Sequence, residues 1–456
     1  METANTTIDL LLTAQRVVTC ASPGGPKRGA ALADAGVIEQ GAVAIDQGRI
    51  VAVGPRAEIA ARYTARSRFD GGDRVLMPGF VDPHTHVCYA GNRIEDFQRR
   101  IAGATYQELM AAGGGIMQTV RHTRAAEQAA LIDQTLVRLD RMLRHGTTTV
   151  EIKTGYGLDT GAELRMLDAI ADLSAAHPCT IVPTFLGAHA IPAEYTRNPD
   201  AYVDLVVNEM LPTVAAAWQS GDRLGRGGFA SSSLFCDVFC EPGAFDLPQT
   251  RRILEQARQL GFALKLHADE FEALGGTTLA VELGATSVDH LVATSQAEAE
   301  TLAASSVVAV ALPGTPLGLG KSQQMPARTL IDSGGALALA SDCNPGTSVC
   351  ESLPLLLALG CRFLRLQPHE AINATTINAA HALGLGDRVG SLEPGKQADL
   401  ILLDLADERE LAYRFGPNPV RYVWKRGYLV ADNTLPPLAT LAASGGIDAP
   451  NAPRDR

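Results

Sequence analysis

The sequence predicts an α/β protein: a TIM-like (β/α)8 barrel plus a small β-sandwich domain formed by both ends of the chain. Two observations lead to this prediction. Strand-like and helix-like segments alternate from about 77 to 387 and supply eight strand-like runs, the number and order of a (β/α)8 barrel. Short β-type runs without helical periodicity gather toward the two ends. A doubly wound parallel sheet is the alternative that the alternation leaves open.

The two ends are expected to form one β domain. Residues 8–20 and 37–53 contain β-type runs broken by Gly41, Gly48 and Gly54, and the same texture returns at 387–405 and 420–433. Neither end has enough strands to bury a core alone. We therefore expect a composite domain of 1–76 with 388–456, around a barrel of 77–387. The glycine-rich, aperiodic stretches 21–36 and 219–233 are interpreted as surface insertions.

The central segment alternates regularly. A helix is expected within 124–145, where leucine and isoleucine recur at helical spacing before Gly146, and a strand follows at 147–152. Thr160 and Glu163 have the spacing of a capping box at the start of the next helix, which His177 and Pro178 end. The eight expected strands are 76–84, 147–152, 180–188, 233–240, 262–268, 286–291, 306–313 and 336–341.

Composition excludes several classes of protein. The 456 residues include 50 acidic and 39 basic side chains, so the net charge of -11 argues against nucleic-acid binding. The first residues lack the basic region of a signal peptide, and no run of about 18 uncharged apolar residues suggests a membrane span. The eight cysteines are scattered without a CxxC pair, as expected for buried thiols in a reducing compartment. We expect a cytoplasmic protein.

Polar side chains lie at the ends of most of the expected strands. Because the carboxyl ends of barrel strands meet on one face, these side chains should converge on one pocket. They are His84, His86, His189, His267, Glu270, His290 and Asp342.

Three imidazoles and one carboxylate of this set predict a metal site. His84 and His86 are two residues apart on an extended segment, so both rings project to the same side. Together with His267 and Asp342 they would bind Zn2+ or a similar divalent ion and leave room for a water molecule. Taken singly, each has a plain structural alternative: an exposed histidine pair, a buried core histidine and a carboxylate that caps a turn.

Other segments are less decisive. Arg93 either clamps a substrate carboxylate or pairs with Glu95 or Asp96 at the surface, and the residues alone favour the surface pair. The glycines of KTGYGLDTG (153–161) do not match a phosphate-binding loop. The glycine run 113–115 is either a lid hinge or an ordinary loop.

These motifs resemble the amidohydrolase superfamily, and more closely the imidazolonepropionase family. The shared segments, which with the strands between them span roughly 8–435, are PGFVDPHTH (78–86), EIKTGYGL (151–158), TFLGAHAIPAEY (184–195), VFCEPGAF (238–245), KLHADE (265–270), SVDHL (287–291) and SDCNPGTS (341–348). The resemblance implies hydrolysis of the ring C–N bond of 4-imidazolone-5-propanoate to N-formimidoyl-L-glutamate in histidine degradation, with one zinc or iron ion per chain.

The resemblance also implies roles for individual residues. The metal ligands would be His84, His86, His267 and Asp342, and the catalytic residues Glu270, His290 and Asp342. Glu270 or Asp342 would help to deprotonate the attacking water, and His290 would polarise the ring oxygen. The substrate contacts would be Arg93, Tyr156, His189, Glu270, Asn344, Gly346 and Thr347. The absence of a lysine from the expected fourth strand favours one metal ion, and a homodimer is expected.

Two other functions remain open at this point. A related amidohydrolase could use the same ligands to deaminate an aromatic base. A barrel without activity could serve as a binding module, because fold alone does not guarantee function.

Overall fold

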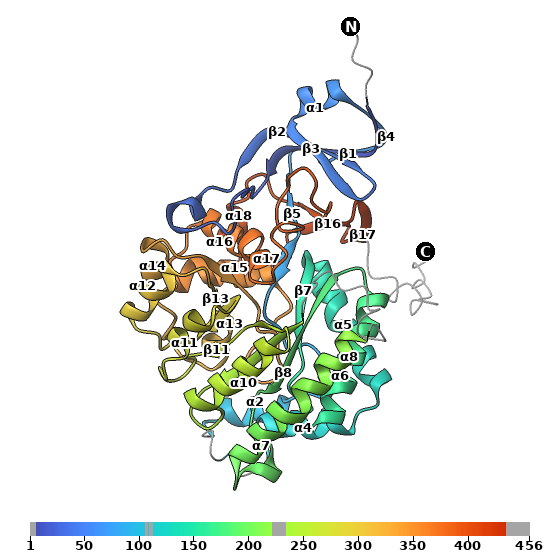
Figure 1. The fold of residues 1–456 in the computed structure, drawn as a ribbon. Coiled ribbons are helices and arrows are strands. Elements are labelled where there is room, and N and C mark those ends of the chain that lie inside the picture. Colours follow the sequence, from blue (N-terminus) through green and yellow to red (C-terminus); the bar gives the residue numbers. More distant parts are fainter. Residues whose placement is uncertain (1–5, 105–107, 109–112, 221–233, 435–456) are drawn as a thin grey trace, which may run out of the picture.

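The computed structural model describes residues 6–104, 108, 113–220 and 234–434 (Figure 1). The expected insertion at 219–233 therefore lies almost entirely outside the described residues. Within the described part of the chain, no helix has both the length and the apolar character that crossing a bilayer requires.

The larger sheet is a parallel barrel, as predicted. Its strand order is β14-β13-β12-β11-β9-β8-β7-β6, and β10 pairs with β9. The strands are β6 (Phe80–Asp82), β7 (Thr147–Lys153), β8 (Thr180–Ala188), β9 (Phe235–Cys240), β10 (Ala263–Leu264), β11 (His267–Ala268), β12 (Ser287–His290), β13 (Val308–Ala311) and β14 (Leu337–Leu339). Since β10 and β11 are two halves of one expected strand, eight strand positions result.

The two edges of this sheet meet, which excludes a doubly wound sheet. A parallel bridge joins Thr85, after β6, to Cys343, after β14. Its backbone hydrogen bonds run from the Asp342 N–H to the His84 carbonyl (3.0 Å) and from the His86 N–H to the Cys343 carbonyl (2.9 Å). Barrel closure therefore places two of the predicted metal-binding segments side by side.

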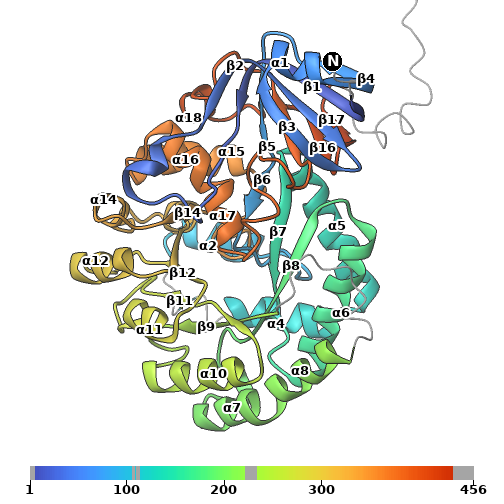
Figure 2. The ribbon, with the colours of Figure 1, turned by 45° about the horizontal axis from the view of Figure 1, so that its top comes forward.

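Helices surround the barrel (Figure 2). They are α2 (Ile94–Ile101), α4 (Ile116–Ala125), α5 (Gln128–Arg144), α6 (Thr160–Ala176), α7 (Pro199–Leu205), α8 (Leu211–Gln219), α10 (Leu247–Gln259), α11 (Gly276–Leu283), α12 (Gln296–Ala304), α13 (Gly314–Gly318), α14 (Ala327–Asp332), α15 (Leu353–Phe363), α16 (Pro368–Ala374) and α17 (Ile377–His381). The strands β7 and β8 are buried along their whole length, because helices cover them outside and side chains fill the barrel inside.

The smaller sheet combines strands from both ends of the chain, as expected. Its order is β17-β16-β15-β5-β1-β2-β3, with β4 paired to β1. The elements are β1 (Thr6–Val18), β2 (Val37–Asp46), β3 (Arg49–Pro55), α1 (Arg56–Arg62), β4 (Tyr63–Asp70), β5 (Val75–Pro78), β15 (Leu400–Leu403), α18 (Glu410–Tyr413), β16 (Val420–Lys425) and β17 (Tyr428–Asp432). The blue and red strands lie together in Figure 1.

Three local predictions were wrong. The run 76–84 is not one strand, because β5 joins the smaller sheet and β6 the barrel, on either side of Gly79. A Cβ at Gly79 would lie 2.4 Å from the Thr148 side chain, so the chain passes between the sheets too tightly for a larger residue. Glu163 does not form a capping box with Thr160, because the cap of α6 is Asp159, whose carboxylate accepts the Ala162 N–H at 2.8 Å.

The segment 21–36 is the third correction, because it packs on the barrel instead of projecting from the surface. Its short 3-10 helix (Gly29–Ala33) buries Leu32 completely. The Asn378 side chain accepts the Lys27 N–H and donates to its carbonyl, each at 2.8 Å. The Arg28 guanidinium donates to the backbone carbonyls of Ala303 and Ser305 at 2.7 Å. This segment therefore connects the smaller sheet to the outer helices of the barrel.

Candidate active site

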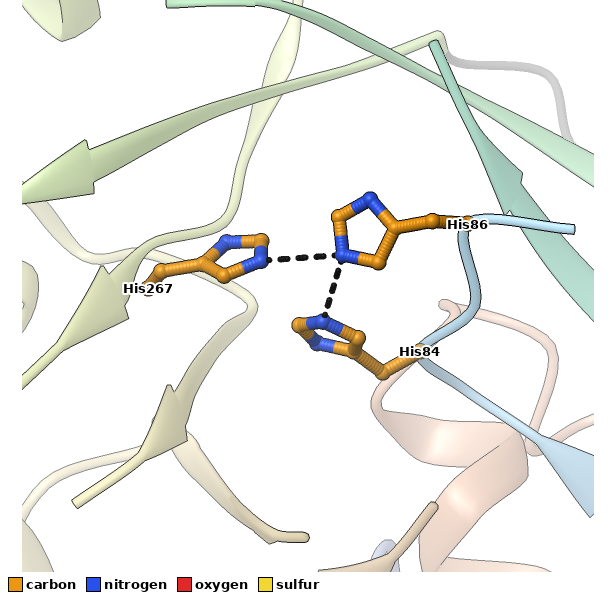
Figure 3. Close-up of side chains that lie close together, drawn as sticks. All are labelled: His84, His86 and His267. Atoms are coloured by element: carbon orange, nitrogen blue, oxygen red, sulfur yellow. Dashed lines mark hydrogen bonds between the residues drawn. The ribbon is translucent and has the colours of Figure 1, made fainter. Parts of the chain in front are cut away.

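Four ligand atoms converge at the carboxyl ends of the barrel strands. The Nε2 atom of His86 lies 3.2 Å from Nε2 of His84 and 3.3 Å from Nε2 of His267 (Figure 3). The carboxylate oxygen Oδ1 of Asp342 lies 3.5 Å from Nε2 of both His84 and His86. All four side chains are buried.

These spacings fit a metal ion. With metal–nitrogen bonds of about 2.1 Å, neighbouring ligand atoms of a tetrahedral site lie about 3.4 Å apart. Figure 3 shows the histidine rings turned toward one point, from the segment after β6 and from β11 opposite. Imidazole nitrogens and a carboxylate oxygen are ligands that zinc and similar ions prefer, so this buried donor set fits the predicted ion.

Two buried carboxylates contact the Nδ1 atoms of the His84 and His267 rings. The Nδ1–H group of His84 donates to Asp289 Oδ2 at 2.6 Å. The Nδ1 atom of His267 lies 3.0 Å from Asp237 Oδ2. Such contacts set the tautomer and leave the Nε2 lone pair free for a metal ion. Sequence analysis missed Asp237 and Asp289, although a charged residue inside an otherwise apolar strand is the signal that marks them.

Lysines complete this buried layer. The Lys153 ammonium lies 2.8 Å from Asp237 Oδ2, 2.9 Å from Glu151 Oε2 and 3.8 Å from Asp289 Oδ2. The Lys265 ammonium lies 3.0 Å from Glu151 Oε1 and donates to the Pro83 carbonyl at 2.7 Å. Two cations thus face three carboxylates, which reduces the cost of burying so many charges. The fourth barrel strand, β9, carries no lysine, and Lys153 lies on β7, where it is held in ion pairs.

Electrostatics favour the neutral form of three histidines of the site, His84, His86 and His290. Burial, together with the Lys153 charge, lowers the pKa of His84 well below its usual value. Burial also lowers the pKa of His86 and, with Lys153 and other histidines nearby, that of His290. Neutral imidazoles are the form that binds metal ions.

Glu270 and His290 lie beside these four residues. Glu270 Oε2 lies 3.6 Å from Nδ1 of His290, and both side chains are buried. Burial raises the pKa of Glu270 well above its usual value, and the Asp342 and Glu241 charges raise it further. Burial raises the pKa of Asp342 to about 6. His290 and Asp342 have positive φ angles of 80° and 49°, backbone strain of the kind that gathers at functional sites.

The predicted substrate contacts lie on the same face. The His189 ring stacks on His86 with centroids 4.8 Å apart and an interplanar angle of 17°. The Tyr156 ring centroid lies 5.2 Å from that of His189 and 6.0 Å from that of His86. Burial raises the pKa of the Tyr156 phenol well above its usual value, so it stays neutral.

Arg93 lies against the loop that follows β14. A Cβ at Gly346 would meet Arg93 Nη1 at 2.5 Å, so a larger residue there would displace the guanidinium from this position. Arg93 does pair with Asp96, at 2.9 Å, but it uses Nε for this contact. Among the described residues its two terminal nitrogens have no hydrogen-bond acceptor. Arg93 therefore forms the expected pair with Asp96, but the pair is largely buried and not at the surface, and its contact with a substrate carboxylate stays a prediction.

The Asn344 side chain holds its own turn. Its Oδ1 atom accepts the N–H groups of Gly346 (2.8 Å) and Thr347 (2.9 Å), and its amide donates to the Asp342 carbonyl at 2.7 Å. The turn thus connects the carboxylate of the metal site to the glycine that borders Arg93.

Comparison with known proteins agrees with this geometry. The model described as "Amidohydrolase family" matches residues 245–430, and "Imidazolonepropionase-like composite domain, bacteria" matches residues 41–65. The chain is 59% identical over 420 residues to an imidazolonepropionase of Herpetosiphon aurantiacus, covering 92% of this chain and 96% of that protein. The chain belongs to the imidazolonepropionase family. An imidazolonepropionase of Chloroflexus aggregans is 53% identical, with 93% and 99% covered.

Solved structures show the same fold in more distant proteins. An adenosine deaminase from Xanthomonas campestris with bound zinc has a TM-score of 0.68, 24% identity and 96% coverage of both chains. A guanine deaminase from E. coli has a TM-score of 0.64 at 15% identity, with 93% and 99% covered. The fold alone therefore does not separate imidazolonepropionases from base deaminases, and the sequence relatives decide between them.

Proposed function

We propose that this chain hydrolyses the ring C–N bond of 4-imidazolone-5-propanoate to N-formimidoyl-L-glutamate, a step of L-histidine degradation, using one zinc or iron ion per chain. The observation that carries the proposal is the convergence of three imidazole nitrogens and one carboxylate in a member of the imidazolonepropionase family. Nitrogen and oxygen ligands of this kind suit both zinc and iron.

The ion would be held by His84, His86, His267 and Asp342. When bound, it supplies Lewis-acid polarisation of a carbonyl oxygen and lowers the pKa of water. The buried layer formed by Asp289, Asp237 and the lysines would keep the histidine rings aimed at it.

Proton transfer would be divided among three side chains. Asp342 would accept the proton of the attacking water through its carboxylate. Glu270, which burial keeps protonated, would deliver a proton to the ring nitrogen as the C–N bond breaks. His290, neutral and 3.6 Å from Glu270, would donate a hydrogen bond to the ring oxygen as negative charge develops there.

Substrate binding would use a second group of residues. The free nitrogens of Arg93 would bind the propanoate carboxylate, beside Gly346. Tyr156 and His189 would contact the ring, and the Asn344 turn would contact substrate or product through Thr347 and backbone groups. A homodimer, a cytoplasmic location and domain limits of 1–76 with 388–456 around 77–387 remain predictions.

A direct assay tests the proposal. Purified protein should remove the ultraviolet absorbance of 4-imidazolone-5-propanoate, with N-formimidoyl-L-glutamate as the product identified by mass spectrometry. Adenosine and guanine, incubated in parallel, should release no ammonia. Ammonia release from adenosine or guanine without turnover of the imidazolone would instead favour a deaminase.

A further inference from the structure

We propose that Glu163 and Glu241 are positioning residues of the active site, each of which holds the backbone of a loop that presents reactive side chains. The inference rests on the proposed function only for the roles of Tyr156, His189 and Glu270. The hydrogen bonds that carry it do not depend on the substrate.

Glu163 lies in the first turn of α6, and its side chain folds back onto the loop after β7. Its carboxylate accepts the N–H groups of Gly155 (3.1 Å), Gly157 (2.8 Å) and Leu158 (2.9 Å). The side chain is fully buried. Three backbone donors thus converge on one carboxylate, and the residue between the held positions is Tyr156.

The backbone of Gly155, which Glu163 holds, also contacts His189, a second residue expected to bind substrate. The Gly155 carbonyl accepts the Nδ1–H of His189 at 3.0 Å, and the His189 ring stacks on His86. Packing around the contact is tight, because a Cβ at Gly157 would lie 2.7 Å from the Glu163 nitrogen. Glu163 therefore sets the backbone positions that orient both Tyr156 and His189.

Glu241 has the same arrangement with the loop that follows β11. It follows β9 and accepts the N–H groups of Glu270 (2.5 Å), Phe271 (3.1 Å) and Glu272 (3.3 Å). Glu241 is only 2% exposed. Since the residue before this loop, Asp269, has a φ of 55°, the loop adopts a backbone conformation that needs external support. Glu241 therefore fixes the backbone position from which the Glu270 side chain extends.

A carboxylate suits this task better than an amide. Both of its oxygens accept hydrogen bonds, and bonds to an ionised acceptor are stronger than neutral ones. Glutamine has the same shape but replaces one oxygen by an NH2 group, which cannot accept a hydrogen bond from the backbone N–H groups that it faces and carries no negative charge. The Glu to Gln changes thus weaken the contact with little change in volume.

Amide hydrogen exchange of the full-length, metal-loaded protein tests the contacts directly. In Glu163→Gln we expect the amides of 155–158 to exchange at least about tenfold faster while those of 270–272 keep the wild-type rate. In Glu241→Gln the pattern should be reversed. The control is Glu408→Gln, which changes a buried carboxylate between β15 and α18 that is bonded to Arg16 on β1 and His369 on α16 and should change neither loop. Unchanged exchange in the held loop, or faster exchange in both loops of one variant, would overturn the proposal.

Kinetics then separate positioning from general stability. Glu163→Gln should raise KM about tenfold or more with a smaller change in kcat, because Tyr156 and His189 bind substrate. Glu241→Gln should lower kcat about tenfold or more at similar KM, because Glu270 transfers the proton. Equal effects on both constants in both variants would contradict distinct roles. If a glutamine variant does not fold, Gly157→Ala and Glu241→Asp disturb the same contacts. A wild-type protein inactive on the imidazolone would reject the proposed function, and the exchange data would still decide these contacts.

Discussion

The Nδ1 atom of His84 lies 2.6 Å from Oδ2 of Asp289, and both side chains are completely buried. This short contact fixes which nitrogen of His84 carries the hydrogen and leaves Nε2 free. The Asp289 carboxylate is in turn 3.8 Å from the Lys153 ammonium. The position of a metal ligand is therefore set by charges in the barrel interior beneath it.

Replacing Asp289 by asparagine should weaken metal binding by about 10- to 100-fold, the usual cost of losing such a supporting carboxylate. The neutral amide fixes the His84 tautomer less strongly and does not balance the positive charge of Lys153. Zinc affinity measured by chelator competition checks this, with the exposed Asp332→Asn as the control. Equal affinities in the two variants would rule out the supporting role of Asp289.

Replacing Glu270 by glutamine should leave the metal content unchanged but lower kcat by about 10²- to 10⁴-fold, the range of general acid–base catalysis. The amide keeps the shape of the side chain but cannot transfer a proton. Glu272→Gln, which changes an exposed side chain on the same loop, should keep wild-type turnover. A fully active Glu270→Gln enzyme would exclude Glu270 as the proton donor.

Replacing Arg93 by glutamine should raise KM for the propanoate substrate by about 10- to 100-fold, the cost of a lost charge-assisted contact, and should change kcat less. Arg99→Gln, an exposed neighbour on α2, is the control. The difference between wild type and Arg93→Gln should disappear with a substrate whose carboxylate is converted to an amide. A difference of the same size with the amide would mean that Arg93 does not bind the carboxylate.

Glu408 should contribute to stability in a pH-dependent way. Burial raises its pKa, but hydrogen bonds from His369 and Arg16 outweigh burial and lower the pKa to about 2. Because the folded-state pKa lies below the unfolded value of about 4.5, the stabilisation is complete above pH 4.5 and is lost as the pH falls toward 2. The free energy of unfolding of Glu408→Gln should therefore be about 1–3 kcal/mol lower than that of the wild type at pH 7. This difference should be smaller at pH 3. Denaturant titrations at both pH values check this, and a difference that grows in acid would contradict the assignment.

Much of the fold could be predicted from the sequence, because each barrel strand is a short apolar run bounded by a helix with its own periodicity. The polar residues at the strand ends were equally visible. The strand assignment failed at 76–84, where hydrophobicity does not change as the chain passes from one sheet to the other at Gly79. Composition also misled at 21–36, because a segment rich in glycine and polar residues can pack through its backbone, as Asn378 shows.

The buried charges were harder to predict. Glu163 has the spacing of a capping residue, and only the fold reveals that its carboxylate turns back to the loop of Tyr156. Lys153 and Asp237 lie on strands that are buried on both faces, so alternation does not show which side chains point inward. Their pairing depends on contacts between strands 84 residues apart, which local sequence does not encode.

Titration of metal-free protein with zinc or ferrous iron, followed by turnover of 4-imidazolone-5-propanoate, tests the central claim most directly. Activity should be absent at the start, rise in proportion to added metal and level off at one ion per chain. The Asp342→Asn variant should gain little activity when metal is added. Full activity without metal, or a rise that continues to two ions per chain, would contradict the single site formed by His84, His86, His267 and Asp342.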